Sequence, residues 1–284
     1  MNEVRICEKI TEKVFMHCTL FNYSEETETF VGYNFDWFGK NGKIWFMPSE
    51  KDRYGYCLTT RFGRSFPYDG MNQWGLYIGQ TAVPVIKNKR KGLKKWCIST
   101  SIINRILGNC RNVDEACAFL RSYNIIFGTF FGLVMFHFMA ADASGESVIV
   151  EYIGNEMRQL KKNETYQVMT NFYISDRDIQ WPDPVQGCGG YDRYEIVEDD
   201  LKGRKTVGVD DVYSILKRVR LDDWMYDGHV YNTLFSNVYK LKTKEILLAY
   251  DKNYERIFSF RLDEELKKGS HFYKIQDLEP KGMS

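Results

Sequence analysis

The sequence lacks a continuous apolar run long enough to cross a membrane. Its most apolar stretch, residues 125–141, is interrupted by Gly128, Gly132 and His137, whereas a spanning helix needs about 20 apolar residues in succession. Residues 1–17 alternate charged residues with single apolar ones, so they also lack the apolar core of a secretory signal. We therefore expect a cytoplasmic protein.

The sequence has no excess of charge of either sign. Lys and Arg number 39 against 38 Asp and Glu, which gives no reason to expect nucleic acid or an anionic membrane as a partner. The one basic run, residues 86–95, is typical of a solvated loop in a chain with this balance. Aromatic residues make up 15% of the chain and suit a pocket for an apolar ligand as well as a packed core. We expect a small-molecule substrate.

The seven cysteines show neither a CxxC pair nor a Cys/His spacing that binds zinc. An odd number of scattered cysteines does not indicate a disulfide framework, and a reducing compartment is the simplest explanation. We expect no metal and no cofactor.

Two strand-like runs near the start of the chain contain the first candidate for chemistry. Residues 14–23 and 29–37 flank a short acidic link and predict a β-hairpin. Cys18, followed by Thr19, lies in the first run, and Asp36 lies at the end of the second. Pairing about the link brings the Asp36 carboxylate toward Cys18, and a thiol beside a fixed carboxylate is a candidate nucleophile. The alternative is that Cys18 is a small buried hydrophobe without chemistry.

The rest of the chain alternates groups of strands with groups of helices, without the regular βαβ order of a doubly wound fold. Asn112 with Glu115 predicts an N-cap for the second helix. We expect strands at 43–48, 54–61, 75–83, 129–139, 147–153, 157–160, 166–170, 229–240, 245–250 and 257–261, helices at 99–108, 113–123, 191–201 and 210–220, and loops at 62–72 and 172–190. This order predicts an α+β fold of antiparallel sheets with helical layers. No linker or composition break divides the chain, so we expect one domain over residues 18–284.

Five short motifs in order resemble the choloylglycine hydrolase and acyltransferase group of N-terminal-nucleophile hydrolases. They are Cys18-Thr19, Gly32-Tyr33-Asn34-Phe35-Asp36-Trp37, Gly70-Met71-Asn72-Gln73-Trp74-Gly75-Leu76, Met169-Thr170-Asn171 and Tyr191-Asp192-Arg193-Tyr194. The group includes penicillin V acylases, bile salt hydrolases and C45 peptidase-like acyltransferases, and the resemblance spans residues 15–261. It implies a four-layer αββα sandwich.

The resemblance also implies an activity and the residues that perform it. Residues 1–17 are then a propeptide removed by self-cleavage, which leaves Cys18 as the N-terminal nucleophile with its own α-amine as the base. Asp36 orients the amine and thiol, and Asn171 holds the oxyanion. Arg193 pairs with a carboxylate, Asp36 being the candidate, or faces the pocket. The reaction is acyl transfer from a linear amide to water, or to another amine or thiol.

Substrate-contacting residues follow from the same resemblance. Tyr33 stands where bile salt and penicillin enzymes have an Arg, and this loss of a cation favours uncharged N-acyl amides over conjugated bile salts. The loop that ends at Asn72 and the strand with Gln80 and Thr81 line the expected pocket, and Ala82 falls where the family often has a polar oxyanion donor. We expect a homodimer or homotetramer.

Two other interpretations stay open. One is a catalytically silent member of the group that acts as a binding or structural protein. The other is a Cys-His thiol hydrolase that uses His137 or His229, although a single His on an apolar strand is more often structural.

Overall fold

The computed structural model describes residues 17–86, 95–127, 135–154, 156–181, 189–226 and 228–278. Residues 1–16 of the expected propeptide, most of the basic run and the first part of the strand expected at 129–139 lie outside these ranges.

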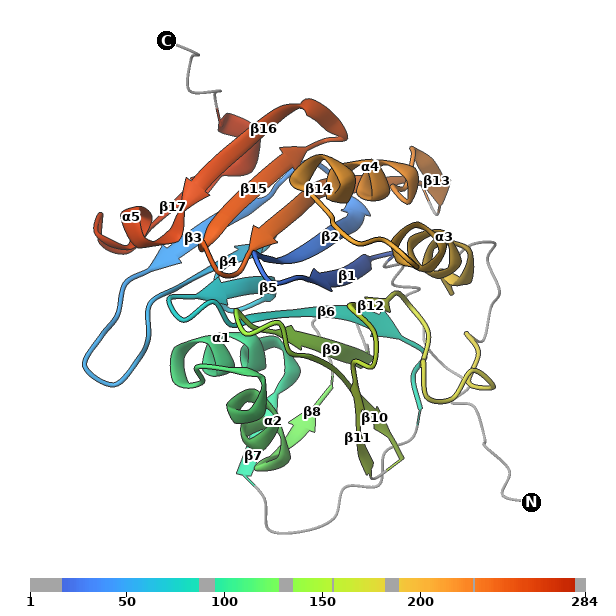
Figure 1. Ribbon diagram of the computed structural model, residues 1–284, viewed down its shortest axis with the longest axis horizontal. Coiled ribbons are helices and arrows are strands. Elements are labelled where there is room, and N and C mark those ends of the chain that lie inside the picture. Colours follow the sequence, from blue (N-terminus) through green and yellow to red (C-terminus); the bar gives the residue numbers. More distant parts are fainter. Residues whose placement is uncertain are drawn as a thin grey trace.

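The first sheet is antiparallel and is built on the predicted hairpin (Figure 1). Its strand order is β12-β1-β2-β14-β15-β16, with β13 paired to β14. The bounds are β1 Thr19–Ser24, β2 Thr29–Phe38, β12 Tyr166–Met169, β13 Trp224–Tyr226, β14 His229–Lys240, β15 Glu245–Tyr250 and β16 Asn253–Arg261. Ser24 faces Thr29 across the acidic turn and Thr19 faces Asn34, so the hairpin prediction is confirmed.

The second sheet is also antiparallel, with the order β11-β10-β9-β6-β5-β4-β3-β17. Its strands are β3 Lys43–Met47, β4 Tyr56–Thr60, β5 Pro67–Asn72, β6 Tyr77–Val83, β9 Met135–Ala141, β10 Ser147–Ile153, β11 Glu156–Lys161 and β17 His271–Lys274. Two further strands, β7 Lys95–Ile98 and β8 Tyr123–Ile126, form a separate parallel pair.

Helices cover the outer face of each sheet, which gives the expected four layers (Figure 1). Helices α3 Tyr191–Leu201 and α4 Val209–Arg218 pack on the first sheet, and α1 Ser99–Asn109 and α2 Val113–Arg121 pack on the second. The side chain of Asn112 accepts a hydrogen bond from the Glu115 N–H at 2.9 Å, so the predicted N-cap of α2 is confirmed. A short helix, α5 Leu262–Leu266, and a 3₁₀ turn, Ile275–Asp277, complete the described part.

Side chains of β2 alternate between two hydrophobic cores. Tyr33 and Phe35 lie in the large core between the sheets, whereas Phe30 lies in the smaller core beneath α3 and α4. On that same helix-facing side, the Asn34 amide donates to the Leu216 carbonyl of α4. A ten-residue strand that is buried on both faces thus joins the two halves of the molecule.

Two expectations about the elements were wrong or incomplete. Residues 62–72 were expected to be a loop, but residues 67–72 form β5, between β4 and β6 in the second sheet. A Cβ at Gly70 would lie 2.3 Å from the Cys57 carbonyl oxygen, so this glycine allows the two strands to approach closely rather than marking a turn. The elements after Arg261 were not predicted, and neither were strand β13 and the β7–β8 pair.

Candidate active site

Cys18 immediately precedes β1 and its thiol is fully buried. It belongs to the core between the two sheets. The Tyr33 hydroxyl lies 3.6 Å from the Cys18 sulfur and 3.1 Å from the Gln80 carbonyl oxygen. Tyr33 is itself fully buried, so its hydroxyl contacts the thiol rather than solvent.

The thiol is held in its protonated form. Burial is the largest cause and the negative charge of Asp36 the second, and together they raise the pKa of Cys18 to about 12. A hydrogen bond from the Asp36 main chain and the charge of Arg193 act in the opposite direction. A thiol with this pKa is a weak nucleophile at neutral pH, so fast reaction at Cys18 needs a base.

Arg193 connects the residues around Cys18. Its Nη1 donates to the carbonyl oxygens of His17 and Cys18 at 2.5 and 2.9 Å and to the Thr19 hydroxyl at 2.8 Å. Its Nη2 donates to the Asn171 side-chain oxygen at 3.0 Å. Within the described residues none of its hydrogen bonds goes to Asp36, so main-chain, hydroxyl and amide oxygens take the place of the expected carboxylate.

The turn before α3 makes room for this guanidinium. Gly190 has a φ of +66°, and a Cβ there would lie 2.6 Å from Arg193 Nη2. Glycine therefore serves both the left-handed backbone and the close approach of the Arg. A cation in the first turn of a helix is disfavoured by the helix dipole, and here its acceptors compensate for that cost.

Asp36 is a buried carboxylate with one unsatisfied oxygen. The Thr233 hydroxyl donates to Oδ1 at 2.6 Å, whereas Oδ2 has no hydrogen-bond partner among the residues that the structure describes. Burial raises the pKa of Asp36 to about 7, although the nearby Arg193 charge lowers it. An orphan oxygen on such a group is a site where a donor can bind.

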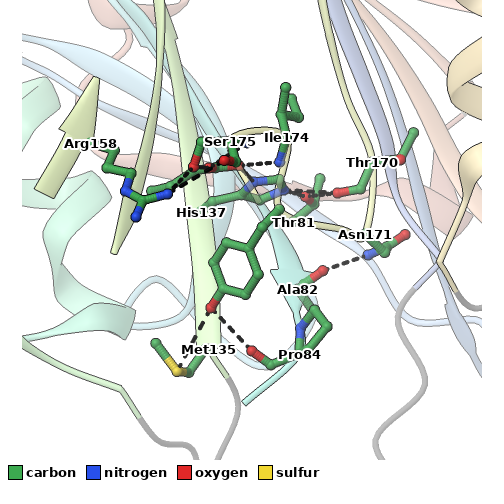
Figure 2. Close-up of polar contacts among 12 residues, drawn as sticks. Thr81, Ala82, Pro84, Met135, His137, Arg158, Thr170, Asn171, Ile174 and Ser175 are labelled. Atoms are coloured by element: carbon green, nitrogen blue, oxygen red, sulfur yellow. Dashed lines mark hydrogen bonds and ion pairs between the residues drawn. The ribbon is translucent and has the colours of Figure 1, made fainter. Parts of the chain in front are cut away.

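Asn171 follows the end of β12, as expected, and its side chain is fixed at both ends. Its Nδ2 donates to the Ala82 carbonyl at 3.0 Å (Figure 2), opposite the Arg193 contact to Oδ1. Its main-chain oxygen accepts from the Trp181 indole at 2.7 Å. Ala82 thus contributes a main-chain acceptor to this site.

The other residues expected at the pocket are engaged within the protein. Asn72 contacts four main-chain groups, those of Leu107, Cys110, Trp74 and Leu76. Gln80 donates to the Pro67 carbonyl at 3.1 Å, and the Thr81 hydroxyl donates to the Thr170 carbonyl. Contact of these three residues with a substrate stays a prediction.

Two histidines were not assigned a role from the sequence. His17 is buried, with a pKa lowered to about 3 by burial and by the charge of Arg193. His137 contacts Glu151, Thr81 and Thr170, and in the described part of the chain neither of its ring nitrogens contacts Cys18. The sequence around a lone His on a strand does not reveal which distant residues it contacts.

His229 lies at the start of β14 and is exposed, and its ring packs on Phe38 at 4.6 Å.

No group of three or more metal-ligating side chains occurs in the part of the chain that the structure describes. None of the helices among the described residues combines the length and apolar character that a membrane crossing requires.

Comparison with known proteins gives consistent matches. The family model for linear amide C–N hydrolases of the choloylglycine hydrolase family matches residues 18–174. A penicillin V acylase from Pectobacterium atrosepticum is 30% identical over 159 residues, which cover 52% of this chain and 39% of that protein. The match therefore spans only about two fifths of that relative's length.

Two solved structures share the fold. A conjugated bile acid hydrolase from Clostridium perfringens has a TM-score of 0.72 at 17% identity, covering 91% of this chain and 96% of that one. A penicillin V acylase from Agrobacterium tumefaciens has a TM-score of 0.68 at 18% identity, covering 91% of this chain and 90% of that one. The expected fold of two antiparallel sheets between helical layers is thus confirmed.

Proposed function

Because the chain belongs to the choloylglycine hydrolase family, we propose that it cleaves linear carbon–nitrogen amide bonds with Cys18 as an N-terminal nucleophile. The observation that carries this proposal is the position of Arg193. One guanidinium donates to the His17 carbonyl that precedes the nucleophile and to the amide of Asn171. The Arg193 guanidinium therefore contacts both the carbonyl of the peptide bond that would be cut and the residue expected to hold the oxyanion.

The first step is cleavage of the chain between His17 and Cys18. The Cys18 sulfur attacks the His17 carbonyl carbon, the C–N bond breaks, and the thiol proton ends on the new α-amine. The acyl group then lies on sulfur as a thioester, and water releases it as the His17 carboxylate. Arg193 Nη1, at 2.5 Å from the His17 oxygen, is placed to stabilise the negative charge that develops there.

Cleavage places a base, the new α-amine, beside the thiol for each later turnover. The new α-amine has an ordinary pKa near 8, so a fraction of it is neutral at pH 7 and can accept the thiol proton. Its ammonium form is a donor for Asp36, whose Oδ2 has no partner among the described residues of the uncleaved chain. Asp36 thereby orients the amine that activates Cys18.

Turnover repeats the same chemistry on an amide substrate. Cys18 attacks the substrate carbonyl, the α-amine transfers the thiol proton to the leaving nitrogen, and a thioester forms. Asn171 Nδ2 carries two N–H groups, of which one is used by the Ala82 carbonyl, so the second is the proposed oxyanion donor. Water, or a second amine or thiol, then takes the acyl group.

The acyl group is proposed to be apolar and the amide uncharged. Tyr33 contributes no charge, and Arg193 is occupied by protein acceptors. Aromatic side chains of β2 and its neighbours supply apolar surface near the end of that strand, with Trp37 and Phe38 stacked at 5.4 Å. Phenoxyacetyl and fatty-acyl amides fit this chemistry.

Mass spectrometry of the purified protein, together with a panel of amides, tests the proposal. We expect a chain that begins at Cys18 and that hydrolyses at least one N-acyl amide. The Cys18→Ala variant should remain uncut and inactive. An uncut wild-type chain that is nonetheless active would refute self-cleavage, and a protein without amide turnover would favour the catalytically silent interpretation.

A further inference from the structure

A buried ion pair lies behind the segment that carries Asn171. His137 on β9 and Glu151 on β10 are fully buried, and Nδ1 lies 3.3 Å from Oε1. Neighbouring strands of the second sheet hold both residues. Burying such a pair costs desolvation energy that its attraction often fails to recover, so the pair is not explained by stability alone.

The ring of His137 faces oxygen atoms at both of its nitrogens. One ring nitrogen faces the Glu151 carboxylate, and Nε2 lies 2.8 Å from the Thr170 carbonyl oxygen and 2.5 Å from the Thr81 hydroxyl (Figure 2). Carboxylate and carbonyl oxygens can only accept, and the Thr81 hydroxyl already donates to Thr170. The ring therefore connects the Glu151 carboxylate to the main chain at Thr170.

Glu151 holds the chain on the other side of Asn171. Its carboxylate accepts from the N–H groups of Ile174 and Ser175 at 2.7 and 3.1 Å, and from the Ser175 hydroxyl at 2.5 Å. Arg158 of β11 approaches the same place and donates to the Ser175 hydroxyl at 3.2 Å. Hydrogen bonds with His137 and Glu151 thus fix the main chain at residue 170 and at residues 174–175. Asn171 lies between these two points.

We propose that His137 and Glu151 are positioning residues for the oxyanion donor, which they fix by holding the main chain on both sides of Asn171. The inference rests on the proposed function, because it requires that Asn171 acts in the transition state. An oxyanion donor must lie at a fixed distance from the developing charge, and a misplacement of about 1 Å can cost about a hundredfold in rate. Two rigid strands are a suitable support for that precision.

The test measures kcat and KM for Glu151→Gln in the self-cleaved protein, at a temperature where the variant is folded. We expect kcat to fall about tenfold or more while KM stays within about twofold, since the substrate itself is not contacted. The same substitution in an Asn171→Ala background should cause no further loss, because the group that it misplaces is gone.

The chain provides a matched control at the far end of the same sheet. Glu265 accepts from His271 at 2.9 Å, also in a largely buried pair, next to β17. Glu265→Gln should lower the melting temperature and leave kcat unchanged. If Glu151→Gln does not fold, Ser175→Ala removes one contact to the carboxylate and should show a smaller loss of kcat that again disappears in the Asn171→Ala background.

The possible results distinguish failure of the positioning role from failure of the proposed function. A loss of kcat of equal size with and without Asn171 would overturn the positioning role, as would a Glu151→Gln enzyme that is less stable but has unchanged kcat. A wild-type protein that turns over no amide would overturn the proposed function, and this inference with it.

Discussion

Replacing Asp36 by Asn in an uncleavable Cys18→Ala chain is expected to raise stability at alkaline pH. Burial raises the pKa of Asp36 from 3.8 to about 7. The folded chain therefore binds the proton more tightly than the unfolded chain does. A raised pKa on an acid penalises folding as pH rises from about 4 to about 7, and the penalty is complete above that range.

The size of the penalty follows from the shift. About three units at roughly 1.4 kcal/mol each correspond to about 4 kcal/mol, which is an upper bound for the uncleaved chain. Asn keeps the acceptor for Thr233, but its amide donor replaces the orphan oxygen, and an unsatisfied donor costs about 1–3 kcal/mol. This second cost does not depend on pH. The difference between the stability effects of Asp36→Asn at two pH values therefore reports only the cost of the buried charge.

Urea unfolding at about pH 4.5 and about pH 8.5 measures the effect on Cys18→Ala chains with and without Asp36→Asn. The Asn variant should gain about 3 kcal/mol relative to the Asp chain between the two conditions. In a chain that begins at Cys18 the sign should reverse near pH 7, because the α-ammonium then pairs with the carboxylate. An equal effect of the substitution at both pH values would contradict the orphan-carboxylate argument.

The other predictions concern cleavage, turnover and substrate. Arg193→Lys should slow self-cleavage, followed by the mass of the chain over time. Arg193 directs Nη1 to the His17 oxygen and Nη2 to the Asn171 oxygen, whereas Lys has a single nitrogen and no planar fork. Cleavage at the wild-type rate would exclude Arg193 from the step. Asn171→Ala should lower kcat by about a hundredfold with a much smaller change in KM, and unchanged kinetics would remove it from the oxyanion site. In an amide panel, phenoxyacetyl and fatty-acyl amides should be hydrolysed faster than taurine and glycine conjugates. The reverse order would indicate that an anionic substrate group contacts a cation of the protein. Arg61 is the candidate, because its guanidinium stacks at 4.4 Å over Phe38 and its Nη1 is unsatisfied among the described residues.

The sequence was sufficient where local chemistry determines the structure. Two apolar runs on either side of an acidic link predict the β1–β2 hairpin, and Asn112 with Glu115 predicts the start of α2. Residues 67–72 contain Pro, Asp and Gly and were therefore expected to be a loop, but strands β4 and β6 pair with them from either side. Pairing partners that lie elsewhere in the chain override such local preferences.

The candidate site could be predicted only in part. Cys18, Asp36, Asn171 and Arg193 were identified by motif order, and the structure brings the last of them to the main chain of the first. The acceptors of Arg193 could not be predicted, since two of them are main-chain carbonyls about 175 residues away, which carry no side-chain signal. The same holds for His137, whose partners Glu151 and Thr170 lie 14 and 33 residues along the chain.

The alternation of side chains along the first sheet gives a reason for the proposed cleavage of the chain before Cys18. Cys18 and Tyr33 direct their side chains to the core between the sheets. Asp36 lies three residues beyond Tyr33 on β2 and so shares the helix-facing side with Asn34. The thiol and the carboxylate proposed to orient it therefore belong to opposite faces of one sheet. The nitrogen of Cys18 lies in the main chain between those faces, and only as a free amine can it accept the thiol proton and donate to the carboxylate.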